Sequence, residues 1–255
     1  MMSKILRVIG DAGHGPNTPG KRSPDGKLRE FQFNKQVTER FKEILEAEYE
    51  GVEVRLVADH KGTTDVPLTT RTNIANSWPA DVYVSIHANA NTGQWGDWTG
   101  IETYVYTTWP KKSTELAKVV HAKLIKATGM RDRGVKAKDL HVLRETKMPA
   151  ILVECGFMDS RIDFPKLMSD EYRETCARAI AEGVAEFYGL KKKVQVKPAQ
   201  PGPFRDVPED HWAAEAIRIV RDAGLMTGRA DGTFGPNEPV TRAQLAAILA
   251  RLMKD

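Results

Sequence analysis

The feature that most constrains this chain is the alternation of short β-rich runs with amphipathic helical patterns over residues 4–190. The β-rich runs contain many Val and Ile residues and alternate only partly with polar residues, as in strands that helices cover on both faces. These runs are ILRVIG, VEVRLV, DVYVSIHA, IETYVY, LHVL and AILVEC, and the helical patterns lie at 30–50, 67–77, 113–128 and 170–188. The alternation predicts an α/β fold, a three-layer sandwich in which helices flank a mostly parallel central sheet.

Composition divides the chain into three parts. Residues 1–190 hold the α/β pattern. Residues 191–203, KKKVQVKPAQPGP, contain four Lys, no acidic residue and no periodicity, which predicts a linker. Residues 204–255 return to helical patterns around a Gly-rich loop, which predicts a small all-α module.

The net charge of +4 is concentrated in this linker, because basic and acidic residues nearly balance elsewhere. A nucleic-acid-binding protein more often carries its basic excess as a patch on a folded face. We therefore predict no nucleic-acid partner. The linker is either a solvated spacer or a segment attracted to an anionic polymer.

The N-terminal segment MMSKILRVIGDAGHG is expected to form the first strand, because it lacks the long apolar stretch and cleavage site of a signal peptide. No window approaches the roughly 18 apolar residues of a membrane span, so no transmembrane segment is predicted. The two cysteines, Cys155 and Cys176, give no disulfide framework and suit a reducing cytosol. We therefore expect cytosolic synthesis.

Four residues that can bind a metal or transfer a proton stand where predicted elements begin or end: His14, Glu30, His87 and Glu154. In open α/β sheets, ligands bind beyond the carboxyl ends of the strands, so these side chains can meet. Two imidazoles and one carboxylate can hold a zinc ion with one coordination position open. A second carboxylate beside that opening suits hydrolysis of an amide by metal-activated water. The pattern predicts a metallohydrolase.

Each of these residues also has a simpler interpretation. A His at a strand end is more often a hydrogen-bonded loop residue, and a Glu at a helix start often serves the helix dipole. Glu154 is harder to explain in this way, because it closes an apolar run and an unpaired buried carboxylate is costly. From the residues alone, the metal site stays one of two interpretations.

Residues 5–188 resemble the zinc-dependent N-acetylmuramoyl-L-alanine amidases of the amidase-3 type. The matching stretches are DAGHG (11–15), Glu30 opening a helix, PLTTRTNIAN (67–76), DVYVSIHANA (81–90), GIETYVY (100–106), LHVLRETKMPAILVECGFMDS (140–160) and a final long helix. The resemblance implies that His14, Glu30 and His87 hold Zn2+ and that Glu154 is the catalytic carboxylate. It also implies that the bond cut joins N-acetylmuramic acid to the L-alanine of the stem peptide.

Other residues near the predicted site leave alternatives open. Trp95 and Trp98 could stack on sugar rings or form a small core under their own loop. Arg71 could anchor a helix or contact a peptide carboxylate, and the structural role is favoured. Asp11 could orient a ligand imidazole or form a turn. His60 follows the second predicted strand and could face the cleft, although no ligand is expected there.

Residues 204–255 resemble a single S-layer homology (SLH) repeat. The matching features are F-x-D-V, HWA, A-I, G-L-M-x-G, D-G-T-F-x-P and V-T-R-A-Q-L-A. The resemblance implies binding of an anionic secondary cell-wall polymer and places Arg242 in the binding motif. This motif reads TRAQ, with Gln244 where Glu commonly stands. Such repeats usually occur in threes, so this lone repeat is expected to self-associate or to anchor weakly.

The leading functional hypothesis is therefore an amidase that lyses peptidoglycan, either a phage endolysin or a host autolysin, released from the cytosol to act at the wall. Two alternatives remain: a zinc peptidase on free peptides, and a non-catalytic wall-binding protein. A wall-binding module would serve no purpose in the first. An intact set of four site residues argues against the second.

Overall fold

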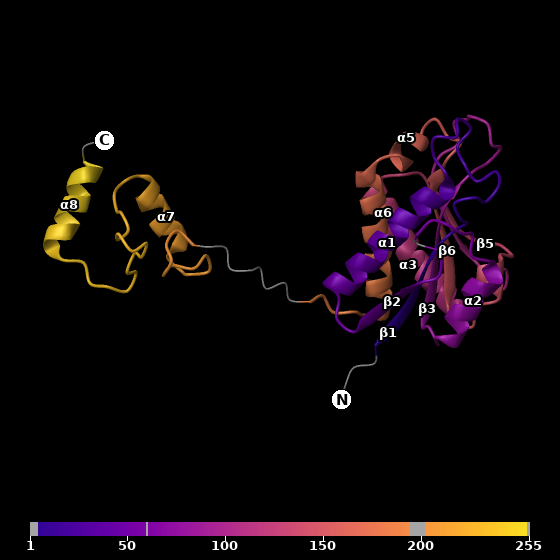
Figure 1. Ribbon diagram of the computed structural model, residues 1–255, viewed down its shortest axis with the longest axis horizontal. Coiled ribbons are helices and arrows are strands. Elements are labelled where there is room, and N and C mark those ends of the chain that lie inside the picture. The colour runs from indigo at the N-terminus through magenta and orange to yellow at the C-terminus, as the bar shows by residue number, and fades with distance from the viewer. Residues whose placement is uncertain (1–4, 60, 194–201, 254–255) are drawn as a thin grey trace. The chain divides into compact units, whose positions relative to one another are not determined.

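The computed structural model describes residues 5–59, 61–193 and 202–253. The chain forms two compact units, residues 1–193 and 194–255, which are described separately (Figure 1). Most of the predicted linker and His60 lie outside the described residues.

A six-stranded sheet forms the centre of the first unit. Its strands are β1 (Leu6–Ala12), β2 (Val52–Leu56), β3 (Val82–Asn89), β4 (Ile101–Val105), β5 (Asp132–Ala137) and β6 (Ala150–Phe157). The strand order is β2-β1-β3-β6-β4-β5. The first four strands in this order are parallel, whereas β4 pairs with β6 in the antiparallel direction and with β5 in parallel. The sheet is therefore mostly parallel, as predicted.

Helices cover both faces of this sheet, which confirms the three-layer sandwich (Figure 1). The helices of the first unit are α1 (Glu30–Glu48), α2 (Leu68–Ser77), α3 (Lys111–Thr128), α4 (His141–Arg144), α5 (Phe164–Leu167) and α6 (Asp170–Tyr188). The larger core lies between the sheet and α1, α3 and α6, and a smaller core lies between the other face and α2 and α4. Neighbouring strand residues face opposite cores, as Val8 and Ile9 do, which explains the apolar runs.

Two elements differ from the sequence prediction. The run LHVL, predicted as a strand, forms the one-turn helix α4, in which Val142 and Leu143 pack in the smaller core. A four-residue apolar run fits a buried helical turn as well as a strand. Strand β5 was not predicted, because it lies at the sheet edge and its six residues are polar or only half-buried.

The parallel arrangement of β1, β3 and β6 brings their carboxyl ends to the same edge of the sheet. Asp11 of β1 lies beside Ser85 of β3, and His87 of β3 lies beside Glu154 of β6. Ser85 and His87 are two residues apart and share one face of the strand. Strand register therefore places two of the four predicted site residues, His87 and Glu154, side by side. His14 lies two residues beyond the end of β1, and Glu30 is the first residue of α1.

The second unit contains helices α7 (Ala214–Asp222) and α8 (Arg242–Leu252) joined by a long loop, in agreement with the predicted all-α module. Its buried core is small and consists of Val207, Ala214 and Ile217. Among the described residues, no helix is both long and apolar enough to cross a membrane. Cys155 and Cys176, in the first unit, are both buried and unbridged.

Candidate metal centre

Three of the predicted site residues converge. His14 follows β1, Glu30 opens α1 and His87 lies near the end of β3, and one ligand atom from each lies within 4.8 Å of the others. His14 Nε2 is 3.2 Å from Glu30 Oε2, and His87 Nδ1 is 2.9 Å from Glu30 Oε1. The two imidazole rings meet edge to face at a centroid distance of 5.0 Å. The Glu30 carboxylate thus bridges both rings.

The electrostatics of this cluster favour an ionised carboxylate. Burial of Glu30 would raise its pKa, but the hydrogen bonds and charges of His14 and His87 outweigh burial and hold the pKa well below its usual value. Burial lowers the pKa of His14. Burial also acts to lower the pKa of His87, but the hydrogen bond to Glu30 and the nearby carboxylates raise it overall.

This donor set fits a divalent metal such as zinc. Two imidazole nitrogens and one carboxylate oxygen are the usual protein ligands of a hydrolytic zinc site, which leaves a fourth position for water or substrate. All three donors are wholly or largely buried, and Glu30 is already held as the anion that a metal requires.

Glu154 lies next to His87 in the sheet but takes no part in the bridge between the imidazoles. Its Oε2 is buried and has no hydrogen-bond partner in the described part of the chain. Burial is the main reason why its pKa rises to about 8. The charge of Glu30 also raises this pKa, and the charge of His87 opposes the rise. Glu154 is therefore a carboxyl group that can exchange a proton near neutral pH.

A strained turn aims His14 at the site. The backbone φ of His14 is 63°, in the left-handed region that residues other than glycine rarely adopt. The neighbouring Gly13 makes room for the second imidazole, because a Cβ there would lie 2.0 Å from His87 Cε1. Asn34 Nδ2 donates to the Gly13 carbonyl at 2.9 Å and so helps to hold the turn.

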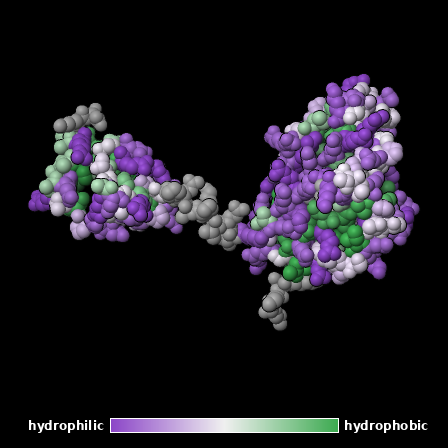
Figure 2. All heavy atoms as spheres, in the orientation of Figure 1, coloured by the Kyte–Doolittle hydropathy of each residue, from purple (hydrophilic) through white to green (hydrophobic). Residues whose placement is uncertain are grey.

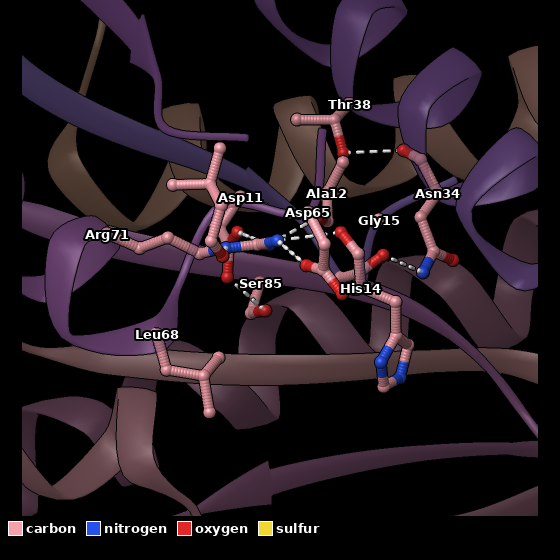
Figure 3. A network of polar contacts seen from close by, with 12 residues as sticks. Asp11, Ala12, His14, Gly15, Asn34, Thr38, Asp65, Leu68, Arg71 and Ser85 are labelled. Carbon is pink, nitrogen blue, oxygen red and sulfur yellow. Dashed lines mark hydrogen bonds and ion pairs between the residues drawn. The ribbon is translucent and has the colours of Figure 1, made fainter. Parts of the chain in front are cut away.

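Arg71, from α2, is the other group that holds this turn (Figure 3). Its side chain is 1% exposed. All five N–H groups of its guanidinium have partners within the chain. They donate to the carbonyls of Val66, Ala12 and His14 and to the carboxylates of Asp11 and Asp65. Arg71 thus has no donor left for a peptide carboxylate, which supports the structural interpretation of this residue.

An apolar cavity of about 520 Å³ opens beside the metal centre. His14 and His87 lie on its wall, together with Asp11 and Arg71. The apolar lining comes from the loop before α2, from α2 and α4 and from β6, and consists of Val66, Pro67, Leu68, Leu140, Val142 and Leu152. A ligand of moderate size can therefore lie against His14 and His87 with an apolar surface on its other side.

The two tryptophans are held against the segment that follows β6. Trp98 Nε1 donates to Asp159 at 2.8 Å, and the Trp95 ring packs edge to face on Phe164. The Asp159 carboxylate also accepts the backbone N–H groups of residues 91–93. Both tryptophans are half-buried and neither lines the cavity beside the metal centre. The geometry favours the small core, and contact with glycan stays a prediction.

Two residues of the site were missed from the sequence, Ser85 and Asn34. Asn34 lies four residues after Glu30, on the same side of α1, and its Nδ2 is 3.4 Å from Glu30 Oε1. Ser85 lies two residues before His87, and its Oγ is 3.1 Å from His87 Nε2. Both could have been identified from their distance in sequence to a predicted ligand, because residues four apart on a helix and two apart on a strand share one side of the element. Asp11 contacts Ser85 and Arg71 but neither imidazole directly.

Comparisons with known proteins agree with both sequence resemblances. Residues 8–186 match the N-acetylmuramoyl-L-alanine amidase family, and residues 203–246 match the S-layer homology domain. The amidase CwlM of Bacillus licheniformis is 39% identical over 188 residues, which are 74% of this chain and 71% of that protein. The endolysin of Bacillus phage SPP1 is 38% identical over 75% of this chain and 69% of its own length.

A solved structure, the N-acetylmuramoyl-L-alanine amidase of Clostridium difficile 630, superposes with a TM-score of 0.69 at 33% identity. The match covers 73% of this chain and 98% of that one. The matched family region accounts for most of the chain and contains all four predicted site residues. The chain therefore belongs to the N-acetylmuramoyl-L-alanine amidase family.

Proposed function

We propose that this protein is a zinc amidase that cleaves the bond between N-acetylmuramic acid and L-alanine in bacterial peptidoglycan. The observation that carries the proposal is the convergence of His14, Glu30 and His87 beside an apolar cavity, in a chain of the amidase family. We assign residues 1–190 to the catalytic domain, 191–203 to a linker and 204–255 to the wall-binding module.

The residues divide the chemistry between holding the metal and moving a proton. His14, Glu30 and His87 would hold zinc, which when bound polarises the scissile carbonyl and lowers the pKa of a water molecule. Glu154 accepts the proton of the attacking water and returns it to the leaving nitrogen of L-alanine. A C–O bond forms as the C–N bond breaks, and the products are a muramic acid carboxylate and a free peptide amine.

The raised pKa of Glu154 suits this role. A carboxyl group with a pKa of about 8 is too weakly acidic to hold its charge at neutral pH in the metal-free protein. A nearby dication favours the carboxylate, because opposite charge lowers the pKa of an acid. Glu154 would then be a base when the metal is present. Its Oε2 has no hydrogen-bond partner in the described chain and is free to accept a proton.

The S-layer homology domain supports attachment to the cell wall, and we propose that Arg242 binds an anionic wall polymer there. Arg242 is exposed in the first turn of α8. Thr241 caps this helix, and the Gln244 side chain accepts the backbone N–H of Thr241 at 2.8 Å. Gln244 therefore fulfils the capping role of the Glu that commonly stands at this position, so its presence leaves the local backbone of the motif intact.

Self-association through this module is a further part of the proposal. No residue of α8 is buried within the described chain. Leu245, Leu249 and Leu252 are each about half exposed and recur at helical spacing. Figure 2 shows hydrophobic residues at the surface along this helix. A second copy of the module would cover this row, and sedimentation of a strict monomer at micromolar concentration would contradict it.

Digestion of purified peptidoglycan tests the catalytic proposal. The expected products are new N-terminal alanine and glycan strands of unchanged length, with activity lost after zinc removal and regained on its return. Release of reducing sugar ends would assign the enzyme to another bond. Activity on free peptides with none on the wall would favour a peptidase, and no release by zinc-loaded protein would favour a non-catalytic wall-binding protein.

A further inference from the structure

Ser85 connects the metal centre to a buried ion pair. It is fully buried on β3, two residues before His87 and beside Asp11 of β1. Its Oγ donates to Asp11 Oδ2 at 2.8 Å and lies 3.1 Å from His87 Nε2. The other oxygen of Asp11 accepts from Arg71 at 2.7 Å. A continuous chain of hydrogen bonds thus runs from the Arg71 guanidinium to the His87 ring, and Figure 3 shows its part from Arg71 to Ser85.

The direction of each hydrogen bond in this chain is fixed by chemistry. A guanidinium only donates and a carboxylate only accepts, so Asp11 must receive a hydrogen from both neighbours. A serine hydroxyl has a single hydrogen, and Ser85 gives it to Asp11. The Ser85 oxygen can then only accept from His87, which places a hydrogen on His87 Nε2.

The consequence reaches the metal site through the imidazole. A neutral imidazole carries one hydrogen, so a ring with a hydrogen on Nε2 has a free lone pair on Nδ1. Nδ1 faces the Glu30 carboxylate, 2.9 Å from Oε1, to which it donates in the metal-free protein, and it is the nitrogen whose lone pair a metal would take in place of that hydrogen. Without Ser85, the competing form with a hydrogen on Nδ1 would be stabilised by Glu30, and that form cannot bind a metal through Nδ1. Arg71, which anchors the turn of His14, therefore also helps to place the hydrogen on the His87 ring.

We propose that Ser85 is a positioning residue which, held by Asp11 and Arg71, keeps the hydrogen of His87 on Nε2 and so presents Nδ1 to the metal. The proposal rests on the proposed metal function of the site. Ser85 is not itself on the cavity wall, and it contacts His87 at Nε2, the ring nitrogen that faces away from Glu30. Its effect is therefore expected in metal affinity, before any effect on the chemistry.

Zinc affinity of the full chain, measured by competition with a chromophoric chelator, tests the proposal. Ser85→Ala is expected to bind zinc about 10- to 100-fold more weakly than wild type, as for other groups that orient a metal-bound histidine. Ser113→Ala is the matched control. Ser113 is also a buried serine, but its Oγ accepts the N–H of Ala150 at 3.2 Å, away from the metal ligands. The control is expected to keep wild-type zinc affinity.

Asp11→Asn reverses the hydrogen-bond direction while keeping the shape. The Asn oxygen can still accept from Arg71, but its NH₂ group donates to Ser85, which turns the Ser85 hydrogen toward His87 Nε2. This variant is expected to bind zinc at least as weakly as Ser85→Ala, although the hydroxyl is still present. If Ser85→Ala binds zinc as tightly as wild type, the positioning role is wrong while the metal site stands. If wild type binds no zinc, the proposed metal function fails and the positioning role with it.

Discussion

Replacing Glu154 by Gln should stabilise the metal-free protein at neutral and alkaline pH, by an amount that increases with pH. Burial and the charge of Glu30 raise the pKa of Glu154 from 4.5 to about 8 in the folded chain. Between these two values the unfolded chain has lost this proton and the folded chain still holds it. The wild-type free energy of unfolding therefore falls as pH rises through this window, and the full contribution is present only below pH 4.5.

The size of the effect follows from the width of the window. Each pH unit inside it changes the free energy of unfolding by about 1.4 kcal/mol. From about pH 5 to about pH 8 the loss in wild type amounts to roughly 3.5 kcal/mol, because titration is incomplete at both ends of the range, and a Gln side chain has no proton to lose there. The difference between the variant and wild type should therefore grow across this range and level off above it.

Urea unfolding of the full chain in excess chelator, at a series of pH values, measures this difference. Tryptophan fluorescence reports on the catalytic unit, which contains four of the five tryptophans, since the remaining Trp212 is 89% exposed. Glu115→Gln removes an exposed carboxyl group and controls for the change in net charge. A difference between Glu154→Gln and wild type that is constant with pH, or that grows toward acid, would refute the reasoning.

Three further predictions concern the turn, the tryptophan loop and the wall-binding module. Gly13→Ala should abolish zinc binding in a chelator competition, because its Cβ would displace the His87 ring. Trp98→Phe should lower the free energy of unfolding by about 1–3 kcal/mol, because the buried Asp159 carboxylate loses a hydrogen-bond donor, while wall hydrolysis is retained. Arg242→Ala should reduce sedimentation with purified walls and leave hydrolysis of a soluble muramoyl peptide unchanged.

Each of these predictions has an outcome that contradicts it. Gly183→Ala also creates a close contact, 2.8 Å from the Val120 Cα, but between α6 and α3, which carry none of the proposed ligands. Equal loss of zinc binding in both glycine variants would therefore show general misfolding. Loss of wall hydrolysis without loss of stability in Trp98→Phe would favour a glycan contact. Unchanged wall binding in Arg242→Ala would remove this residue from the polymer site.

Much of the fold was predictable because strand and helix patterns are local. The helix expected at 170–188 appears with the same bounds, and the strand expected at 81–88 appears as β3, one residue later at each end. The errors fall where local pattern is ambiguous. The run at 140–143 is too short to distinguish a strand from a helical turn, and β5 has too few buried apolar residues to mark a strand.

The sequence predicted the positions of the site residues better than it predicted their hydrogen-bond partners. His14, Glu30, His87 and Glu154 stand where the predicted elements begin or end, although β6 continues for three residues beyond Glu154. The role of Arg71 could not be decided from the sequence, because its partners are mostly backbone carbonyls and carboxylates far along the chain. Hydrogen-bond direction depends on such distant neighbours, so it emerges only in three dimensions.

The position of β6 in the sheet has a consequence for the order of assembly during synthesis. This strand is the last of the six to be made, yet it lies between β3 and β4 and joins the two halves of the sheet. A nascent chain that stops before residue 150 has every proposed zinc ligand but lacks Glu154 and the strand that unites the sheet. Insertion of β6 therefore completes the sheet and also delivers the proposed catalytic base, so lytic activity should begin only after the sheet is assembled.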